Sequence, residues 1–234
     1  MDAFYASVEL LRYPQLKGLP VVIGGGRRRE DDALTVAYGG RLADIPVDAF
    51  PLLRDYVGRG VITTATYQAR AFGVGSAMGM MKAAKLCPQA ILLPVDFARY
   101  RQFSRQFKAI ITSIAPQMED RGVDEVYIDF THVEDGQHNH GRSLALRLQS
   151  EIQTATGLTC SVGVAPNKQL AKMASEFNKP NGVSIVLESD LQTLIWPLAC
   201  RKINGIGPKA DAKLQALGIT TLGDLAAKDL HWLV

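Results

Sequence analysis

The sequence has no Cys-x-x-Cys pair, no apolar run of membrane-spanning length and no secretory signal peptide. Its three cysteines, Cys87, Cys160 and Cys200, are widely spaced, which argues against both a disulfide framework and a zinc site. We interpret them as reduced core thiols and expect a cytoplasmic protein without membrane contact. Three of the four histidines fall within residues 132–140, where we favour a solvated loop over a metal site.

Neither sign of charge dominates the composition. The 26 Lys and Arg residues exceed the 23 Asp and Glu residues by three, and the isoelectric point is near 8.7. This mild excess is compatible with a polyanionic partner and equally with an ordinary soluble enzyme. Apolar residues make up 47% of the 234 residues, enough to build one large or two to three small packed domains.

Strand-like and helical segments alternate through most of the sequence, and the pattern is helical from residue 189 onward. Helices are predicted at 3–13, 67–72, 79–86, 96–114, 142–155 and 168–177, the last capped by Asn167. Strands are predicted at 19–23, 61–64, 91–94, 123–130, 158–165 and 183–187. We expect Gly24–Gly26 to end the first strand, residues 27–32 to be a solvated charge run, and a short helix to form near 50–56. This order favours an α+β body followed by a small helical domain.

Two acidic residues, Asp124 and Glu125, stand side by side at the start of the strand predicted over 123–130. Strand neighbours point to opposite faces, so both carboxylates reach one metal pair only if the backbone bends, and Gly122 permits such a bend. Two divalent ions about 4 Å apart can clamp the attacking and leaving oxygens of a phosphoryl transfer, and Mg²⁺ prefers oxygen ligands. Taken alone, the pair favours a solvated strand end.

Four motifs considered together change that interpretation. They are DAFYASVE at 2–9, TTATYQAR at 63–70, DEVYID at 124–129 and NKQLAKMASEFNKPNG at 167–182. Together they resemble the Y-family of translesion DNA polymerases, in particular its bacterial members, over nearly the whole chain.

The resemblance implies a right-handed α+β polymerase core with a palm, small fingers and a helical thumb. The implied divisions are fingers at 3–95 with an insertion near 30–58, a palm at 1–2 and 96–187, and a thumb at 188–234 with a helix-hairpin-helix. The hairpin is the INGIGPK segment at 203–209, whose glycine turn exposes N–H groups that can hold a DNA phosphate. Similar hairpins occur in glycosylases, ligases and nucleases, and a simple turn between helices is the alternative.

The resemblance also implies roles for individual residues. Asp124 and Glu125 would bind two Mg²⁺ ions, with the Met1 carbonyl as a further ligand, and Tyr5 would be the steric gate that excludes a 2′-hydroxyl. The residues implied on the incoming deoxynucleoside triphosphate are Phe4, Tyr5, Thr64, Tyr67, Arg70 and Lys179. Those implied on primer-template DNA are Lys168, Lys172, Gly205, Gly207 and Lys209. Without the motifs, we would interpret Tyr5 as a packed helix residue and the lysines as solvated.

The sequence departs from the family's pattern in three places. The opening strand ending in Asp-x-Asp is missing, so Met1 takes the middle position and Asp2 the second, with its side chain expected to point away from the metals. The extra segment near 30–58 is expected to pack, because it is partly apolar. The C-terminal little-finger domain and the clamp-binding tail are absent from the sequence, so we expect low DNA affinity and restrict a sliding-clamp partner to a longer form.

The main hypothesis is therefore a template-directed, error-prone translesion DNA polymerase without proofreading. Its activity as written is in doubt because the first metal-binding Asp is missing, which indicates either a trimmed start or an impaired enzyme. One alternative is a catalytically impaired, DNA-binding relative or fragment that acts as a scaffold in DNA damage tolerance. Another is a helix-hairpin-helix repair enzyme such as a glycosylase, for which Asp224 is the nearest candidate acid.

Overall fold

A computed structural model describes residues 1–28 and 33–229, which form two compact units. The first unit comprises Met1–Ala109, Asp120–Val126 and Ala155–Leu158, and the second comprises Ile110–Glu119, Tyr127–Thr154 and Thr159–Val234. The palm implied by the sequence is thus divided between the two units. The assignment of fingers, palm and thumb remains a prediction.

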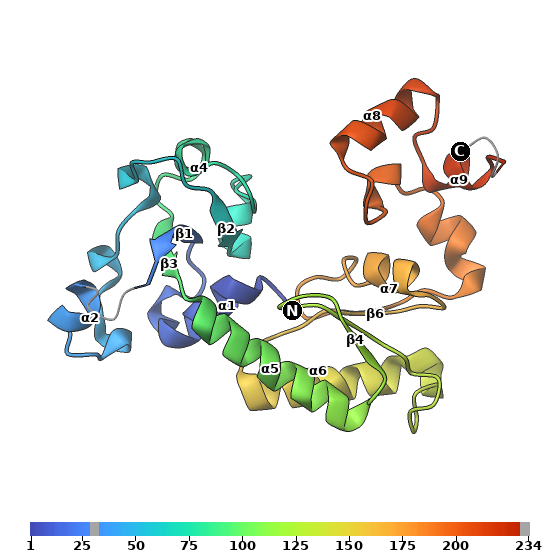
Figure 1. Ribbon diagram of the computed structural model, residues 1–234, viewed down its shortest axis with the longest axis horizontal. Coiled ribbons are helices and arrows are strands. Elements are labelled where there is room, and N and C mark those ends of the chain that lie inside the picture. The colour runs from blue at the N-terminus through green and yellow to red at the C-terminus, as the bar shows by residue number, and fades with distance from the viewer. Residues whose placement is uncertain (29–32, 230–234) are drawn as a thin grey trace. The chain divides into compact units, whose positions relative to one another are not determined.

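The first unit is built on a three-stranded sheet with the order β2-β1-β3 (Figure 1). Strand β1 (Val21–Arg27) pairs antiparallel with β2 (Ile62–Ala65) and parallel with β3 (Ile91–Val95). The expectation that Gly24–Gly26 ends the first strand is wrong, because β1 continues through all three glycines. The pairing register shifts after Ile23, and Gly25 has φ +77°, so the glycines accommodate an irregular strand instead of ending it.

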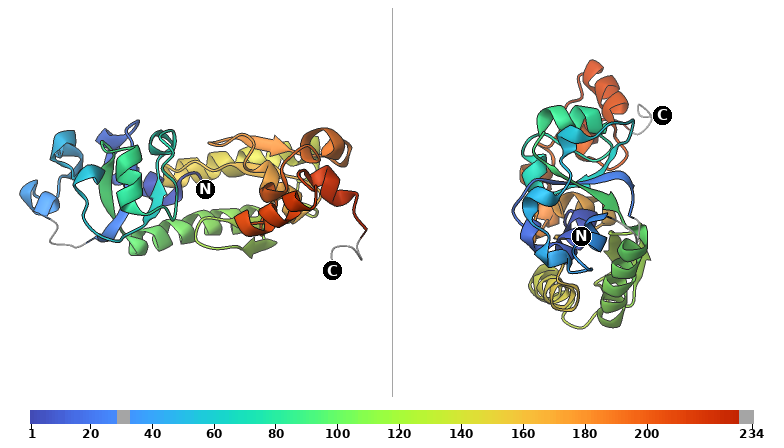
Figure 2. Two further views of the ribbon diagram at one scale, coloured as in Figure 1. Left: turned by 90° about the horizontal axis from the view of Figure 1, so that it is seen from above. Right: turned by 90° about the vertical axis from the view of Figure 1, so that its left-hand side faces the viewer.

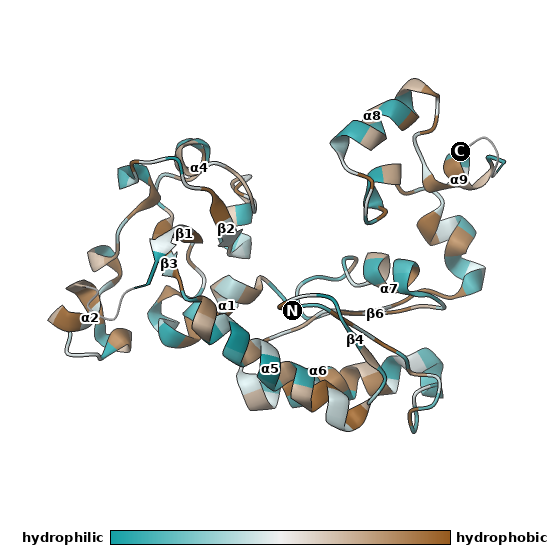
Figure 3. Cartoon of the chain, in the orientation of Figure 1, coloured by the Kyte–Doolittle hydropathy of each residue, from teal (hydrophilic) through white to brown (hydrophobic). Residues whose placement is uncertain are grey.

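Helices surround this sheet. They are α1 (Phe4–Arg12), α2 (Ala33–Ala37), α3 (Tyr67–Arg70), α4 (Met80–Leu86) and α5 (Phe97–Ile114), the last of which continues into the second unit. Helix α1 buries Phe4, Ala6 and Val8 in one apolar core with residues of β1 and β3. Helix α5 is one continuous coil (Figure 2), and polar and apolar residues alternate along it (Figure 3), as its sequence pattern predicts.

The extra segment packs as expected. Its apolar residues Ile45, Phe50 and Leu53 are buried, and the backbone at Pro51 and Leu53 exchanges hydrogen bonds with the residues around β3. The short helix expected near 50–56 is instead a 3₁₀ turn at Leu53–Asp55. Its brevity follows from this pairing, which holds the neighbouring backbone extended. Residues 29–32 of the charge run lie outside the described part of the chain.

A second correction concerns Arg28, which was expected to be solvated. Its guanidinium donates to the Tyr13 hydroxyl (2.6 Å) and the Thr35 hydroxyl (3.1 Å). Because Tyr13 directly follows α1, Arg28 connects the end of that helix to the extra segment. Periodicity could not show this, because the partners are distant in sequence.

The second unit contains a parallel pair of strands, β6 (Val162–Val164) and β7 (Val183–Ile185), with α7 (Lys168–Ala174) between them in sequence. Asn167 caps α7 as predicted, since its side-chain oxygen accepts from the Leu170 N–H at 2.9 Å. Helix α6 (Arg142–Thr156) precedes β6 in sequence. The strand predicted at 158–165 is longer than the observed β6.

The acidic pair lies in the connection between the two strands of a short sheet, β4 (Met118–Asp120) and β5 (Val126–Ile128). The predicted strand 123–130 is shortened to β5, and β4 was not predicted because its three residues carry no period. Beyond β7, the second unit is helical as expected, with a π-helical turn at Leu191–Ile195 followed by α8 (Pro208–Ala216) and α9 (Leu222–Ala226).

Two further expectations can be compared with the described residues. His132, His138 and His140 are all exposed in a turn and a 3₁₀ segment, as the loop interpretation requires. None of the helices traced within residues 1–28 and 33–229 has the length and apolar character needed to cross a membrane.

Candidate functional site

The backbone bends just before the acidic pair, as its chemistry requires. Gly122 adopts φ +124°, a conformation that favours glycine. The Lys108 ammonium of α5 donates to the Asp120 carboxylate at 2.9 Å and to the Gly122 carbonyl at 2.6 Å. The turn is thereby fastened to a long helix, and the position of the following Asp124 is set by that helix.

The first unit brings Met1, Tyr5 and Asp124 together. The Met1 amino group donates to the Asp124 backbone carbonyl at 2.8 Å. Burial and, to a lesser degree, the negative charge of Asp124 raise the pKa of the Tyr5 hydroxyl. The Asp124 side chain is half-buried, whereas Glu125 is exposed. Asp2 is 2% exposed, and its side chain is thus largely withdrawn from solvent.

The oxygen donors at this place fit a divalent cation in part. Two adjacent carboxylates and the Met1 main-chain carbonyl are hard ligands of the kind that Mg²⁺ prefers. Within the described residues, no group of three His, Cys, Asp or Glu side chains is placed to hold a metal. The acidic pair therefore provides two carboxylates of a ligand set.

Tyr5 lies on an aromatic support. Its ring stacks on Tyr100 with centroids 4.1 Å apart and an interplanar angle of 15°, and it meets the Phe97 ring edge-on at 6.1 Å. Phe4 is 4% exposed; its ring centre lies 5.7 Å from that of Tyr5, and it packs edge-on against Phe107. Any contact of Phe4 with a nucleotide is therefore left to its backbone, because its side chain belongs to the core.

Thr64, Tyr67 and Arg70, which the resemblance implies on the triphosphate, lie together in the structure. The Arg70 guanidinium donates to the Ala65 carbonyl (3.0 Å) and to the Thr64 hydroxyl (3.5 Å). It also lies 5.1 Å from the centre of the Tyr67 ring. The result is a compact, positively charged group at the end of β2 and the start of α3.

One buried hydroxyl, that of Thr66, organises this group. It caps α3 by accepting from the Ala69 N–H (3.4 Å), accepts from the Val21 N–H (2.9 Å) and donates to the Leu19 carbonyl (3.1 Å). The residue was missed as a positioning element, although a Thr directly before a helical segment is a recognisable capping signal.

The implied DNA-contacting lysines belong to the second unit. Lys168 pairs with Glu119 and lies 5.9 Å from the Tyr127 ring centre. Lys179, implied on the triphosphate, pairs with Glu176 at 2.6 Å. The Lys168 pair is exposed and the Lys179 pair is partly exposed, so each contributes little to stability.

A groove of about 430 Å³ in the second unit joins α7 to the glycine turn of the hairpin. It brings together Lys172 with Gly205 and Gly207, three of the five residues implied on DNA. Arg201 and Lys202 also line it, and the motif gave no signal for them because they precede it. Gly207 directly precedes α8, which carries Lys209 in its first turn.

Asp224, the acid that a glycosylase would need, has a structural task. Its carboxylate accepts from the Thr220 and Thr221 N–H groups at 3.1 and 2.9 Å, and the Thr221 hydroxyl accepts from the Asp224 N–H. These hydrogen bonds lower the pKa of Asp224 to about 2. A general acid needs a pKa near the working pH, so this carboxylate is suited to capping α9 and unsuited to donating a proton.

Comparison with solved structures defines the class. The DinB protein from Sulfolobus solfataricus matches with a TM-score of 0.79 and 31% identity over 99% of this chain and 60% of that chain. The insertion ternary complex of Dbh DNA polymerase matches with a TM-score of 0.80, 31% identity and the same coverage. The fold is thus a Y-family DNA polymerase core, which confirms the resemblance drawn from the motifs.

The family follows from the sequence comparisons. The chain belongs to the impB/mucB/samB family, whose model matches residues 1–176, and the IMS family HHH motif matches residues 188–219. It is 40% identical over 235 residues to DNA polymerase IV of Caulobacter vibrioides, covering 99% of this chain and 50% of that relative. It is 39% identical to DNA polymerase IV of Xanthomonas euvesicatoria, covering 99% and 56%. The chain spans about half the length of these curated relatives.

Proposed function

We propose that this chain carries the catalytic core of a template-directed DNA polymerase of the translesion type, which extends a primer with deoxynucleotides. The observation that carries the proposal is the family match over residues 1–176, which includes the Asp124–Glu125 pair beside Met1 and Tyr5. The proposed partners are primer-template DNA and deoxynucleoside triphosphates, and the proposed cofactors are two Mg²⁺ ions.

Asp124, Glu125 and the Met1 carbonyl would hold the metal ions. When bound, such ions would offset the negative charge of the triphosphate and of the attacking 3′-oxygen. The protein would position the substrate. Tyr5 would lie against the sugar, and Arg70, held by its hydrogen bond to the Ala65 carbonyl, would bind phosphate oxygens with its planar guanidinium. Lys179 would place a further positive charge beside the triphosphate after exchanging the Glu176 carboxylate for a phosphate oxygen.

The groove between α7 and the hairpin would hold the DNA backbone. Lys172, Arg201 and Lys202 supply positive charge there, and the Gly205 turn supplies backbone N–H groups. Contacts of this kind track phosphates and carry no sequence information, which suits an enzyme that copies any template.

A second candidate is a DNA-binding scaffold without catalysis. It is favoured by the two-carboxylate ligand set, since no third metal-binding side chain joins Asp124 and Glu125 within residues 1–28 and 33–229. It predicts primer-template binding without nucleotide addition.

Primer extension with Mg²⁺ separates the two candidates. The assay compares this chain, a chimera extended by the flanking segments of the Caulobacter relative, and Asp124→Asn/Glu125→Gln variants of each. The polymerase proposal expects extension by the chimera at least and a loss of about a thousandfold in the double variant, with DNA binding retained. Glu134→Gln, an exposed carboxylate in the 131–141 loop, is the matched control and should leave extension unchanged. Binding without extension by either form would support the scaffold instead.

A further inference from the structure

Tyr100 makes two contacts with one face of α1. Its ring stacks on Tyr5, with centroids 4.1 Å apart, and its hydroxyl donates to the Glu9 carboxylate at 2.8 Å. Tyr5 and Glu9 are four residues apart and therefore stand one above the other on the helix. Tyr100 is fully buried, whereas Tyr5 is only partly so. The exposed side of Tyr5 thus faces outward with Tyr100 directly behind it.

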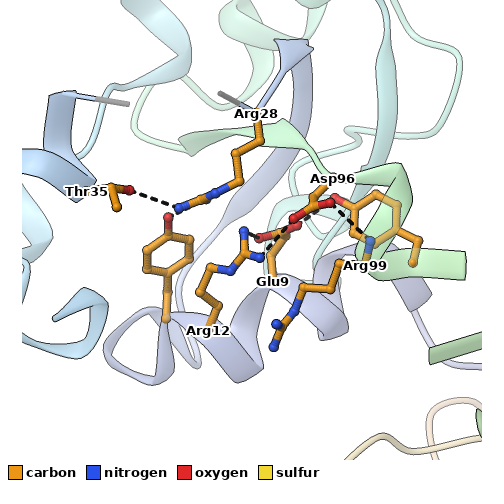
Figure 4. A network of polar contacts seen from close by, with 8 residues as sticks. Glu9, Arg12, Arg28, Thr35, Asp96 and Arg99 are labelled. Atoms are coloured by element: carbon orange, nitrogen blue, oxygen red, sulfur yellow. Dashed lines mark hydrogen bonds and ion pairs between the residues drawn. The ribbon is translucent and has the colours of Figure 1, made fainter. Parts of the chain in front are cut away.

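The carboxylate that holds Tyr100 is itself fixed. Glu9 is fully buried, and its second oxygen lies 3.6 Å from the Arg12 guanidinium. Arg12 in turn bonds the Asp96 carboxylate at 2.9 Å, and Asp96 accepts from the Arg99 N–H at the start of α5 (Figure 4). The start of the helix that carries Tyr100 is therefore tied to the helix that carries Tyr5 through a closed set of polar contacts.

The chemistry of the contact suits a fixed support. Burial first, and the Glu9 carboxylate second, raise the pKa of the Tyr100 hydroxyl, so it remains a donor at all working pH values. A stacked ring at 4.1 Å is already in van der Waals contact, so Tyr5 cannot retreat without displacing Tyr100. Displacing Tyr100 would break its hydrogen bond to a buried carboxylate, which is costly.

We propose that Tyr100 and Glu9 are positioning residues for sugar selection, which hold the Tyr5 ring against the incoming nucleotide so that ribonucleoside triphosphates are excluded. The inference rests on the proposed polymerase function. In this proposal, Tyr100 and Glu9 act only through the Tyr5 ring and do not contact the substrate. The alternative is that Tyr100 is an ordinary core residue whose loss lowers stability and leaves selection unchanged.

The test compares Tyr100→Leu, Tyr100→Phe and Glu9→Gln. Equilibrium binding of a deoxynucleoside triphosphate and its ribonucleotide counterpart to the complex with primer-template DNA is measured with Ca²⁺, without turnover. The full chain and its chimera are both used. The matched control is Phe107→Leu, which shortens a buried ring of α5 that contacts Phe4 and not Tyr5.

Tyr100→Leu should lower the preference for the deoxynucleotide on the order of tenfold, the size typical of a changed pocket wall. Tyr100→Phe should lower it less, because the ring remains and only the anchor is lost. Glu9→Gln should stay near the parent, since the amide oxygen still accepts, and Phe107→Leu should match the parent. If both Tyr100 variants keep the parent's preference for the deoxynucleotide, the proposal is overturned. If Tyr100→Leu does not fold, the result for Tyr100→Phe alone decides between the proposal and the alternative.

A second readout needs no nucleotide. Stacking on Tyr100 should shift the nuclear magnetic resonance signals of the Tyr5 ring in the unliganded chain, and Tyr100→Leu should abolish that shift. Loss of the shift with unchanged sugar preference counts against the proposal. If the parent binds neither nucleotide while the shift is present, the proposed polymerase function fails, and that result is distinct from failure of the Tyr100 assignment.

Discussion

An ion pair behind Tyr5 in the first unit and an ion pair of the second unit lie in opposite environments. In the first unit, Glu9 is fully buried and its partner Arg12 is 14% exposed. In the second, the Lys168–Glu119 pair has side chains that are 63% and 41% exposed. The first group cannot exchange partners without opening the core, whereas the second can do so in solvent.

This difference separates charges that fix geometry from charges that meet a partner. Burying an ion pair carries a desolvation cost that its attraction only partly offsets, so Glu9 and Arg12 are not explained by stability alone. They lie behind Tyr5, whose ring must be held in place for the proposed sugar selection. Exposed pairs contribute little to folding and can exchange a carboxylate for a phosphate. The same residue types thus serve two tasks, decided by burial.

The largest effect is expected when the buried ion pair of this comparison loses one partner. Arg12→Ala removes the nearest cation from Glu9, whose pKa burial already raises, and should destabilise the first unit by about 3 kcal/mol, because this buried carboxyl group then loses most of its charge compensation. Hydrogen exchange of the α1 amides is the measurement, since it reports on this unit separately. Lys179→Ala removes a cation from a more exposed pair and should change stability by less than about 0.5 kcal/mol. Equal effects of the two substitutions would show that burial does not separate these charges.

The next effect concerns a buried neutral group. Thr66→Val keeps the shape but removes the hydroxyl that serves the Ala69 and Val21 N–H groups, and should cost about 2 kcal/mol. The start of α3 should loosen, and the proposed binding of the triphosphate by Tyr67 and Arg70 should weaken. Thermal unfolding and nucleotide binding measure the two effects, and Thr66→Ser, which keeps the oxygen, should restore most of both. Weakened binding in the serine variant would contradict this reason.

The sequence predicted the helices well where capping and periodicity agree. The Asn167 cap before α7 and the helix predicted at 96–114, which is α5, are examples, because capping and periodicity are local signals. It predicted β4 and the ends of β5 poorly, since three-residue strands are defined by their partner and not by their own pattern. The glycines of β1 were misjudged for the same reason: Gly24 pairs with Ile62 of β2, and Arg27 beyond the glycines pairs with Val95 of β3, so partner strands extend β1 past them.

The candidate site shows the same limit. The Asp124 pair and the Thr64–Arg70 group could be named from motifs, and in the structure the members of the latter contact one another. Tyr100 could not be assigned to Tyr5, because 95 residues of sequence separate them and its pattern marks only a buried helix position. Arg201 and Lys202 were missed because their role depends on a groove formed with α7.

A smaller effect sharpens the exposed side of the comparison. Lys172→Ala and Lys202→Ala should each weaken primer-template binding equally for all sequences and reduce its salt dependence by about one unit of slope. Stability should hardly change. Titrations at several salt concentrations measure the slope, and the exposed Lys17 of the first unit, replaced by Ala, is the control. An unaltered slope in both groove variants would remove the groove from the proposed DNA path.

The smallest expected effect is an acid sensitivity of the second unit. Hydrogen bonds from Thr220 and Thr221 lower the folded-state pKa of Asp224 from 3.8 to about 2. A lowered folded pKa means that the ionised carboxylate favours the folded state, so its contribution is complete above pH 3.8 and is lost as the pH falls toward 2. In a Trp232→Phe background, Trp196, whose carbonyl accepts from the Gly223 N–H of α9, is the sole tryptophan. Its fluorescence in urea should show a steeper loss of stability between pH 4 and 2 than in the same protein with Asp224→Asn, because the asparagine does not titrate. Parallel pH profiles would mean that this exposed carboxylate contributes nothing to folding, and it would then again be available for a chemical role in the hairpin domain.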